Sequence, residues 1–436
     1  MGNRKTFSAV ALAVAGALTA GAAGATDGYF SHGYGMKAKG RGGASTAMTT
    51  DTFGGANNPA TMVWVGDRVD AGVDLFRPDR KASRSGSTGL GFGNVDGAAD
   101  GNDTTNFLIP EFGYNKLINP NLSLGVTVYG NGGMNTDYSG STIPAGRCGA
   151  SPANLLCGSG NLGVDLSQLV IAPTAAYKVN SQHSIGVSPL IAYQRFKAYG
   201  LQPFAAISSD PANLTNKGYD SAWGWGVRLG WLGKLSDTVS VGAAYSSKIK
   251  MGEFDKYRGL FAERGGFDIP DNYNFGIAFK ATPAVTIAAD YQRINYSKVK
   301  SVGNPSNQPN CPGAGCLGAS SVSIGFGWDD VNVIKLGVEY AWSSRMLLRA
   351  GYNHTDNPIQ SRDVTFNILA PGVVQQHVTA GFTYGLGDGS EITMAYMHAF
   401  KKSVSGPATN PYFPVGGTET IAMSQNSLGI AWGKKF

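Results

Sequence analysis

Four cysteines are the first residues whose spacing indicates a chemistry. They form two close pairs, Cys148 with Cys157 and Cys311 with Cys316, in polar stretches rich in Gly, Pro and Asn. Neither pair has a zinc-site spacing, and no histidines lie nearby at ligand spacing, so a metal site is the weaker alternative. In an oxidising compartment the pattern predicts two local disulfides that staple loops, and we expect no metal or cofactor.

Catalytic chemistry finds no support in the motifs of the chain. The sequence contains no H-E-x-x-H, no G-x-S-x-G and no Walker-type loop. Five histidines are scattered, at His32, His183, His354, His377 and His398. We therefore expect a protein that is not an enzyme.

Two lysines have the spacing to meet an anionic group from one face of a strand. In the segment that begins at Val285, Lys298 and Lys300 share the parity of Thr286 and Asp290. A carboxylate needs such a cation. The alternative is that both lysines are solvated charges at the rim of the fold.

Segments with a period of two must carry these residues. In 223–231, WGWGVRLGW, the aromatic and aliphatic residues share one face, and glycines and Arg228 share the other. The same alternation recurs in 285–291, 334–342 and 378–384. Apolar-out, polar-in alternation with aromatics near the strand ends is typical of a transmembrane β-barrel. Such a sheet has to close, because lipid cannot satisfy unpaired backbone groups.

Composition points the same way. The chain has 62 Gly and only 15% charged residues, whereas soluble domains average about 25%. Beyond the N-terminus no apolar run reaches the length of a transmembrane helix. The net charge of +6 includes Arg4 and Lys5, and there is no long basic run, so nucleic acid is not an expected partner.

The connections alternate between short and long. We expect short periplasmic turns at 118–121, 179–182, 235–238, 281–284, 343–345 and 387–390. We expect long extracellular loops near 79–105, 139–163, 200–220, 254–270, 301–329, 356–373 and 403–420. This alternation predicts an all-β protein, an antiparallel barrel of about 14 strands.

The two ends of the chain carry targeting signals. Arg4 and Lys5, an apolar run over 7–20 and Ala23-Gly24-Ala25 predict a secretory signal peptide over 1–25, with an N-terminal membrane helix as the alternative. The last strand ends at Phe436, which resembles the assembly signal of outer-membrane barrels. Expected partners are therefore the barrel assembly machinery, through Phe436, and outer-membrane lipid and lipopolysaccharide.

The segment between the signal peptide and the barrel is rich in small residues. Residues 40–62, GRGGASTAMTTDTFGGANNPATM, include a predicted turn at Asn57-Asn58-Pro59-Ala60. Small residues let backbone pack tightly in a confined space. We therefore predict that 26–66 form a hatch within the lumen of a barrel over 67–436. A disordered periplasmic tail is the alternative.

Several segments in order resemble the FadL-type outer-membrane transporters of long-chain fatty acids and hydrocarbons. GYGMKAKGRGGAST followed by NNPA resembles the hatch of that family. Four downstream stretches resemble family strands, at 223–254, 269–300, 333–359 and 396–404. The resemblance covers nearly the whole mature chain, and it rests on the order and spacing of the motifs.

The resemblance implies a monomeric 14-stranded barrel that passively transports hydrophobic molecules across the bacterial outer membrane. A ligand would be captured at extracellular loops, held in an apolar pocket, and released through the wall by movement of the hatch and of a kinked strand. The candidate kink is Asn131, Gly132 and Gly133, in the third strand. Three of the four residues over 130–133 are glycines, which favours a bulge. An ordinary strand end is the alternative.

The resemblance also bears on the cations. It places a carboxylate-binding lysine near Lys298 and Lys300, and Arg195 and Lys197 match a family Arg-x-Lys pair. The ligand-binding arginine of the family falls near Gly200, where this chain has no cation. Arg195 and Lys197 have outward parity, unless Pro189 marks a bulge.

Two other functions remain as alternatives. A general porin would have 16–18 strands and a polar channel. An outer-membrane lipase would need a lumenal triad, for which His377 offers a histidine but the sequence reveals no serine partner. Fatty acids, alkanes and monoaromatics all remain compatible as ligands.

Overall fold

The structure is a computed structural model. It describes residues 26–89, 94–140, 143, 147–148, 153–308, 310–311, 313 and 315–436. The predicted signal peptide, 1–25, lies outside the described residues. Within the described ranges, no helix has the length and apolar character needed to cross a membrane.

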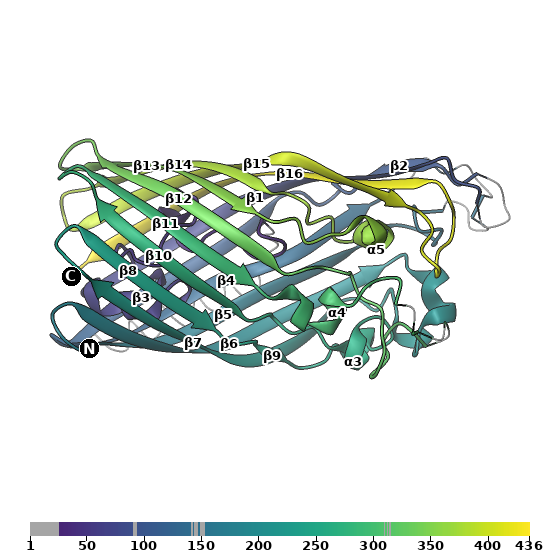
Figure 1. Cartoon of the computed structure of the whole chain (residues 1–436), viewed down its shortest axis with the longest axis horizontal. Helices are drawn as coiled ribbons and strands as arrows, with labels where there is room; N and C mark the ends of the chain where they lie inside the picture. Colours follow the sequence, from purple (N-terminus) through teal and green to yellow (C-terminus); the bar gives the residue numbers. More distant parts are fainter. Residues whose placement is uncertain are drawn as a thin grey trace.

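The chain folds into a closed antiparallel β-barrel (Figure 1). Of the 16 strands in the sheet, β2 (Gly97–Asp100) and β9 (Lys250–Met251) are short side pairings on β1 and β7, which leaves 14 barrel strands. These are β1 (Arg68–Ser85), β3 (Phe107–Asn119), β4 (Leu122–Tyr138), β5 (Leu162–Lys178), β6 (His183–Tyr199), β7 (Asp220–Lys234), β8 (Val239–Ser246), β10 (Asn272–Lys280), β11 (Val285–Ile294), β12 (Val331–Ala341), β13 (Met346–Thr355), β14 (Gln376–Gly385), β15 (Ser390–Pro407) and β16 (Thr418–Lys435). Pairing of β1 with β16, from Arg68 opposite Lys435 to Ser85 opposite Thr418, closes the barrel.

All six predicted short turns separate consecutive strands, at one end of the barrel. The long loops lie at the other end. Two predicted loops are shorter than expected, because β1 continues to Ser85 and β15 to Pro407. Short helices occupy the long loops, namely η3 (Gln202–Ile207), η4 (Pro211–Asn213), η5 (Asp255–Tyr257), α3 (Ala262–Gly265), η6 (Tyr296–Lys298), α4 (Lys300–Gly303), η7 (Ser361–Asp363) and α5 (Val364–Asn367).

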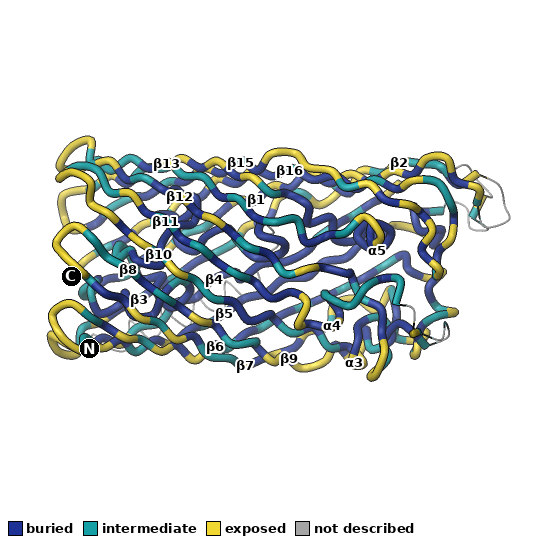
Figure 2. The backbone as a smooth tube through the Cα atoms, viewed as in Figure 1, coloured by how far each residue is buried: buried dark blue, intermediate teal, exposed yellow. Residues whose placement is uncertain are grey.

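The predicted parity of the strands is confirmed. On β7, Trp223, Trp225 and Leu229 are exposed on the outer surface, while Arg228 is buried on the lumen side. Figure 2 shows the same alternation of exposed and buried positions along the barrel wall. An apolar outer face suits lipid, and charged residues are kept to the inside and the ends.

Both predicted disulfides are present, Cys148–Cys157 and Cys311–Cys316. Each closes a short stretch of chain, with sequence separations of 9 and 5 residues. Closing a short loop removes little conformational entropy from the unfolded chain. Each bridge should therefore add at most about 3 kcal/mol to the free energy of unfolding. We expect peptide mapping without reductant to recover these two bridges; free thiols or crossed pairs would contradict the assignment.

Candidate functional site

Residues 26–66 lie inside the barrel, mainly in the half that ends in the short turns (Figure 1). They include α2 (Met36–Lys39), η1 (Phe53–Gly55) and η2 (Pro59–Trp64). Helix α2 packs near β14 and β15, whereas η2 packs on β5, β6 and β7. The segment is therefore a hatch that contacts opposite sides of the wall. Its own helices are short, of 4, 3 and 6 residues, so the surrounding barrel holds it in place.

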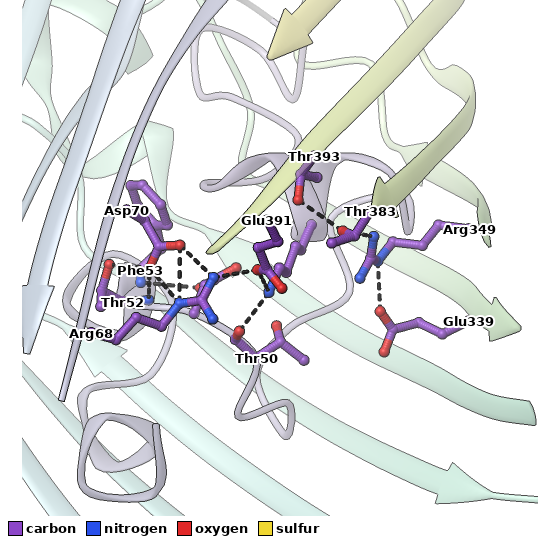
Figure 3. Close-up of polar contacts among 12 residues, drawn as sticks. Thr50, Thr52, Phe53, Arg68, Asp70, Glu339, Arg349, Thr383, Glu391 and Thr393 are labelled. Carbon is purple, nitrogen blue, oxygen red and sulfur yellow. Dashed lines mark hydrogen bonds and ion pairs between the residues drawn. The ribbon is translucent and has the colours of Figure 1, made fainter. Parts of the chain in front are cut away.

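A buried charge cluster joins the hatch to β12 and β13. Arg41 Nη1 of the hatch lies 2.9 Å from Glu339 Oε2, and Arg349 Nε lies 2.6 Å from the same oxygen. Arg349 also donates to Thr383 Oγ1 at 2.6 Å, an arrangement visible in Figure 3. The carboxylate of Glu339 is thus the shared counter-ion of two guanidinium groups that are buried away from water.

A second cluster joins the hatch to β1 and β15, the strands on either side of β16 (Figure 3). Lys37 Nζ of α2 lies 2.5 Å from Glu391 Oε1 of β15, which also pairs with Arg68 of β1. Asp70 of β1 accepts hydrogen bonds from Thr52 N at 3.1 Å and Thr52 Oγ1 at 2.7 Å. The hatch therefore bridges the seam at which the barrel closes.

A third anchor is a carboxylate on β11. Asp290 Oδ2 accepts from Ser45 N at 2.8 Å, Thr46 N at 2.9 Å and Thr46 Oγ1 at 2.7 Å. The hatch can approach the wall closely here because the neighbouring residue of β10 is Gly276. A side chain at that position would collide with Thr46 and Asp290. Three donors to one buried oxygen fix this part of the hatch in register with the sheet.

The predicted hatch turn lies against β6 and β7. Asn58 Oδ1 caps η2 by accepting from Ala60 N at 3.1 Å, and Asn58 Nδ2 donates to Trp231 O at 2.9 Å. Gly230 admits this contact, since a Cβ there would lie 2.1 Å from Asn58 Oδ1. Pro59 packs in the same way over Gly186. The inward glycines thus make room for the hatch.

The glycine-rich stretch of β4 contains a bulge. Its register with β5 shifts between Gly130 and Gly132, so Asn131 is the extra residue. The ladder between β3 and β4 runs only from Asn119 opposite Leu122 to Phe112 opposite Val128. Beyond Val128, β4 continues to pair with β5 but no longer with β3.

The first residues of the hatch cover this break in the ladder. Ser31 N donates to Asn131 O at 3.2 Å, Gly133 N donates to Tyr29 O at 3.1 Å, and Phe30 forms a bridge with Gly132. Tyr34 Oη adds a hydrogen bond to Asn131 O at 3.0 Å. Thr26–Tyr34, here called the N-terminal segment, therefore supplies the partner that β4 loses when it leaves β3.

Apolar and aromatic side chains fill the lumen between the hatch and the long loops. Tyr29 packs on Tyr296 and Trp328, with ring centroids 5.1 and 5.9 Å apart. A cavity of about 30 Å³ lies further toward the loops. Its lining is largely aromatic and aliphatic, including Val164, Phe196, Phe261, Leu317, Phe326 and Leu369. A space of that size holds a water molecule or two, so a larger ligand has to displace side chains.

The expected lumenal alternation does not reach Lys298 and Lys300, because β11 ends at Ile294 and the chain turns into η6 and α4. Lys298 Nζ lies 2.9 Å from Asp271 and Lys300 Nζ lies 2.8 Å from Glu263, and both lysine side chains are about half exposed. The hydrogen bond that Lys298 donates to the Asp271 carboxylate raises the pKa of Lys298.

Arg195 and Lys197 also lie apart from the lumen. The register of β6 with β7 is unbroken through Pro189, so there is no bulge to turn these residues inward. Both cations instead lie over the ring of Tyr219, at 4.7 and 4.9 Å from its centroid. The structure does not bring the four predicted cations into one site, and their role as carboxylate contacts stays a prediction.

Several charged residues of the lumen were not among the predicted site residues. These are the hatch anchors and inner cations Arg41, Arg228, Asp290, Lys335, Glu339 and Arg349. For those on strands, all except Arg41, inward parity on an otherwise apolar strand was the available signal, since a charge at such a position must be satisfied inside. Their hatch partners could not be read from the chain, because pairs such as Arg41 and Glu339 are 298 residues apart.

A closed 14-stranded barrel whose lumen holds an ion-paired hatch defines the class of plugged outer-membrane transport channels. Residues 13–430 match the family model described as outer membrane protein transport protein (OMPP1/FadL/TodX), and the chain belongs to that family. It is thus an outer-membrane transporter of hydrophobic compounds and not an enzyme. No curated protein matches the chain significantly.

Solved structures share the fold. The Pseudomonas putida toluene transporter TodX superposes with a TM-score of 0.67 at 19% identity, covering 93% of this chain and 99% of that one. A Pseudomonas aeruginosa FadL homologue gives 0.68 at 17%, covering 94% and 100%. The Ralstonia pickettii toluene transporter TbuX gives 0.63 at 18%, covering 93% and 99%. In the orientation usual for such barrels, the short turns are periplasmic and the long loops extracellular.

Proposed function

We propose that this channel takes up long-chain fatty acids or related hydrophobic compounds and releases them sideways through its wall. The observation that supports this proposal most is the break between β3 and β4, which the N-terminal segment covers at the bulge, over 131–133. In a sheet, an edge whose partner is a short, separately held segment is easier to open than a continuous ladder.

The route begins at the extracellular loops and passes through the apolar cavity. Each buried methylene contributes about 0.8 kcal/mol, so ten of them contribute about 8 kcal/mol before the costs of ordering. Burial of such a ligand can offset the free-energy cost of displacing aromatic side chains from a cavity that is nearly filled. The hatch, held by its three anchors, keeps the periplasmic end closed, so the ligand leaves at the β4 bulge.

The neighbours do not decide the substrate. TodX and TbuX are described as toluene transporters and a third neighbour as a FadL homologue, all below 25% identity. The choice of fatty acids therefore depends on the chemistry of this lumen. Mass spectrometry of lipids that co-purify with the protein would identify the class of ligand directly.

We expect cells that lack this gene to lose uptake of a long-chain fatty acid or a hydrocarbon, and complementation to restore it. The physical reason is that the outer leaflet resists the passage of hydrophobic molecules, which the lumen instead solvates. Radiolabelled uptake measures the effect. Liposomes that contain the protein should leak small sugars slowly; rapid leakage would favour the general porin instead.

A further inference from the structure

Arg228 is a buried cation whose counter-ion is missing from the described part of the chain. It projects from β7 into the lumen with 3% of its surface exposed. Its one hydrogen bond there is a long one, from Nη1 to Gly55 O at 3.5 Å. Among the other buried arginines, Arg41, Arg68, Arg84 and Arg349 each pair with a carboxylate. Arg80 has no carboxylate partner but donates short hydrogen bonds to Asn135 O and Thr104 O, both at 2.6 Å. A buried guanidinium without an anion is unfavourable, so its environment calls for a ligand.

The guanidinium lines a polar cavity of about 10 Å³ between the hatch and the wall. Two acceptors in the cavity lining also lack partners, Asn274 Oδ1 and Asp290 Oδ1. This volume suffices for one water molecule at most. A larger partner for Arg228 can therefore enter only if a neighbouring segment moves.

The other two charged groups at this cavity, Lys335 and Asp290, each have direct partners, although Asp290 Oδ1 stays without one. Lys335 Nζ donates to His32 O at 3.0 Å and lies 3.9 Å from Asp27 Oδ2. Asp290 is held through Oδ2 by the hatch amides. Arg228 is thus the cation whose positive charge is not matched by a direct contact with a carboxylate.

The cavities of the lumen change from apolar to polar along one direction. The apolar cavity near the loops is lined by Phe326 and Leu369, and the next, of about 20 Å³, by Trp328 and Ala370. Gly28 of the N-terminal segment lines that second cavity, while Phe30 and Tyr34 of the same segment line the polar one. The N-terminal segment therefore separates an apolar space from a cationic space.

We propose that Arg228 is the head-group site for a hydrophobic ligand that bears a carboxylate. When the N-terminal segment moves aside, the chain of the ligand lies toward Trp328 and its carboxylate pairs with Arg228, with Lys335 nearby. Guanidinium and carboxylate groups match in a two-point contact, which a neutral ligand cannot make. This inference rests on the proposed function, because the ligand has to reach the lumen.

The position also connects binding with release. Tyr34, which lines the polar cavity, donates to Asn131 O at the β4 bulge. A carboxylate that displaces Tyr34 would therefore remove one of the contacts that hold the N-terminal segment over the break in the wall. Head-group recognition and opening of the wall then depend on the same segment.

The test compares hexadecanoic acid with hexadecan-1-ol, each binding to the full protein in nanodiscs. Arg228→Met should weaken binding of the acid about tenfold or more, since a charge-assisted hydrogen bond is lost, and should leave binding of the alcohol within about twofold. Arg228→Lys should retain part of the preference for the acid. Arg345→Met, which removes an exposed arginine at a short turn, is the matched control and should change neither.

Other outcomes overturn the assignment. Equal losses for acid and alcohol would make Arg228 a support of the hatch, and a loss confined to the acid in Lys298→Ala with Lys300→Ala would place the head group at the rim. If Arg228→Met fails to fold, as judged by heat-modifiable migration on a gel, Arg228→Gln replaces it in the same comparison. Failure of both ligands to bind the wild type would instead refute the proposed function.

Discussion

Deletion of Asn131 is expected to reduce uptake of a hydrophobic substrate to the level of cells that lack the protein. Asn131 is the extra residue of the β4 bulge, between Gly130 opposite Leu169 and Gly132 opposite Gln168. Without it the pairing of β4 with β5 becomes regular, and the strand loses the local bend that a bulge produces. Its upper part can then return to β3 and complete the ladder, which closes the proposed exit.

The uptake assay needs a control for the loss of any bulge. Strand β15 offers one, because its register with β16 shifts between Ala399 and Lys402. Strands β16 and β1 separate β15 from the break between β3 and β4. Deletion of Lys401 should regularise that pairing and leave uptake at the wild-type level. Both variants should still show heat-modifiable migration, which reports a folded barrel. Normal uptake by a folded Asn131 deletion would rule out the β4 bulge as the exit.

Local patterns predicted the wall of the barrel well. The turns at 235–238 and 281–284, for example, separate strands whose alternating residues face lipid on one side. A lipid-exposed strand has to alternate, and a closed sheet has to connect neighbours, so the sequence alone carries this information. The stretch around Asn131 was also readable, since clustered glycines mark a bulge in a strand.

The inside of the barrel was less predictable, because its contacts join distant parts of the chain. Extending the alternation of β11 from Val285 predicted that Lys298 and Lys300 face the lumen. The strand ends at Ile294, and the alternation of side chains ends with it. Conversely, Arg228 had the right parity, yet nothing in its own segment showed that it would meet the hatch at Gly55. The lumen is determined by pairs between hatch and wall, which no local period encodes.

Replacement of Glu339 by leucine is expected to release the hatch. The carboxylate of Glu339 lies against both Arg41 and Arg349, and both arginine side chains are 1% exposed. Removing one partner of a buried ion pair typically costs about 3–5 kcal/mol, because the remaining charge stays buried without compensation. Here two guanidinium groups lose their anion at once. The hatch around Arg41 should therefore open far more often, and the barrel should leak small polar solutes.

Liposome swelling in a sugar solution measures the leak, and hydrogen exchange of the amides over 36–48 measures the opening of the hatch. Asp388→Ala is the matched control, since it breaks the exposed pair with Lys434 at a short turn and should change neither readout.

A triple variant separates loss of charge balance from loss of shape. Arg41→Met, Glu339→Leu and Arg349→Met together replace the buried ions by apolar side chains, which buried sites often tolerate. This variant should close the barrel again and restore slow exchange. If Glu339→Leu alone leaves swelling and exchange unchanged, the ion pairs do not hold the hatch. The remaining anchors, at Asp290 and Glu391, would then be sufficient to keep the periplasmic end closed.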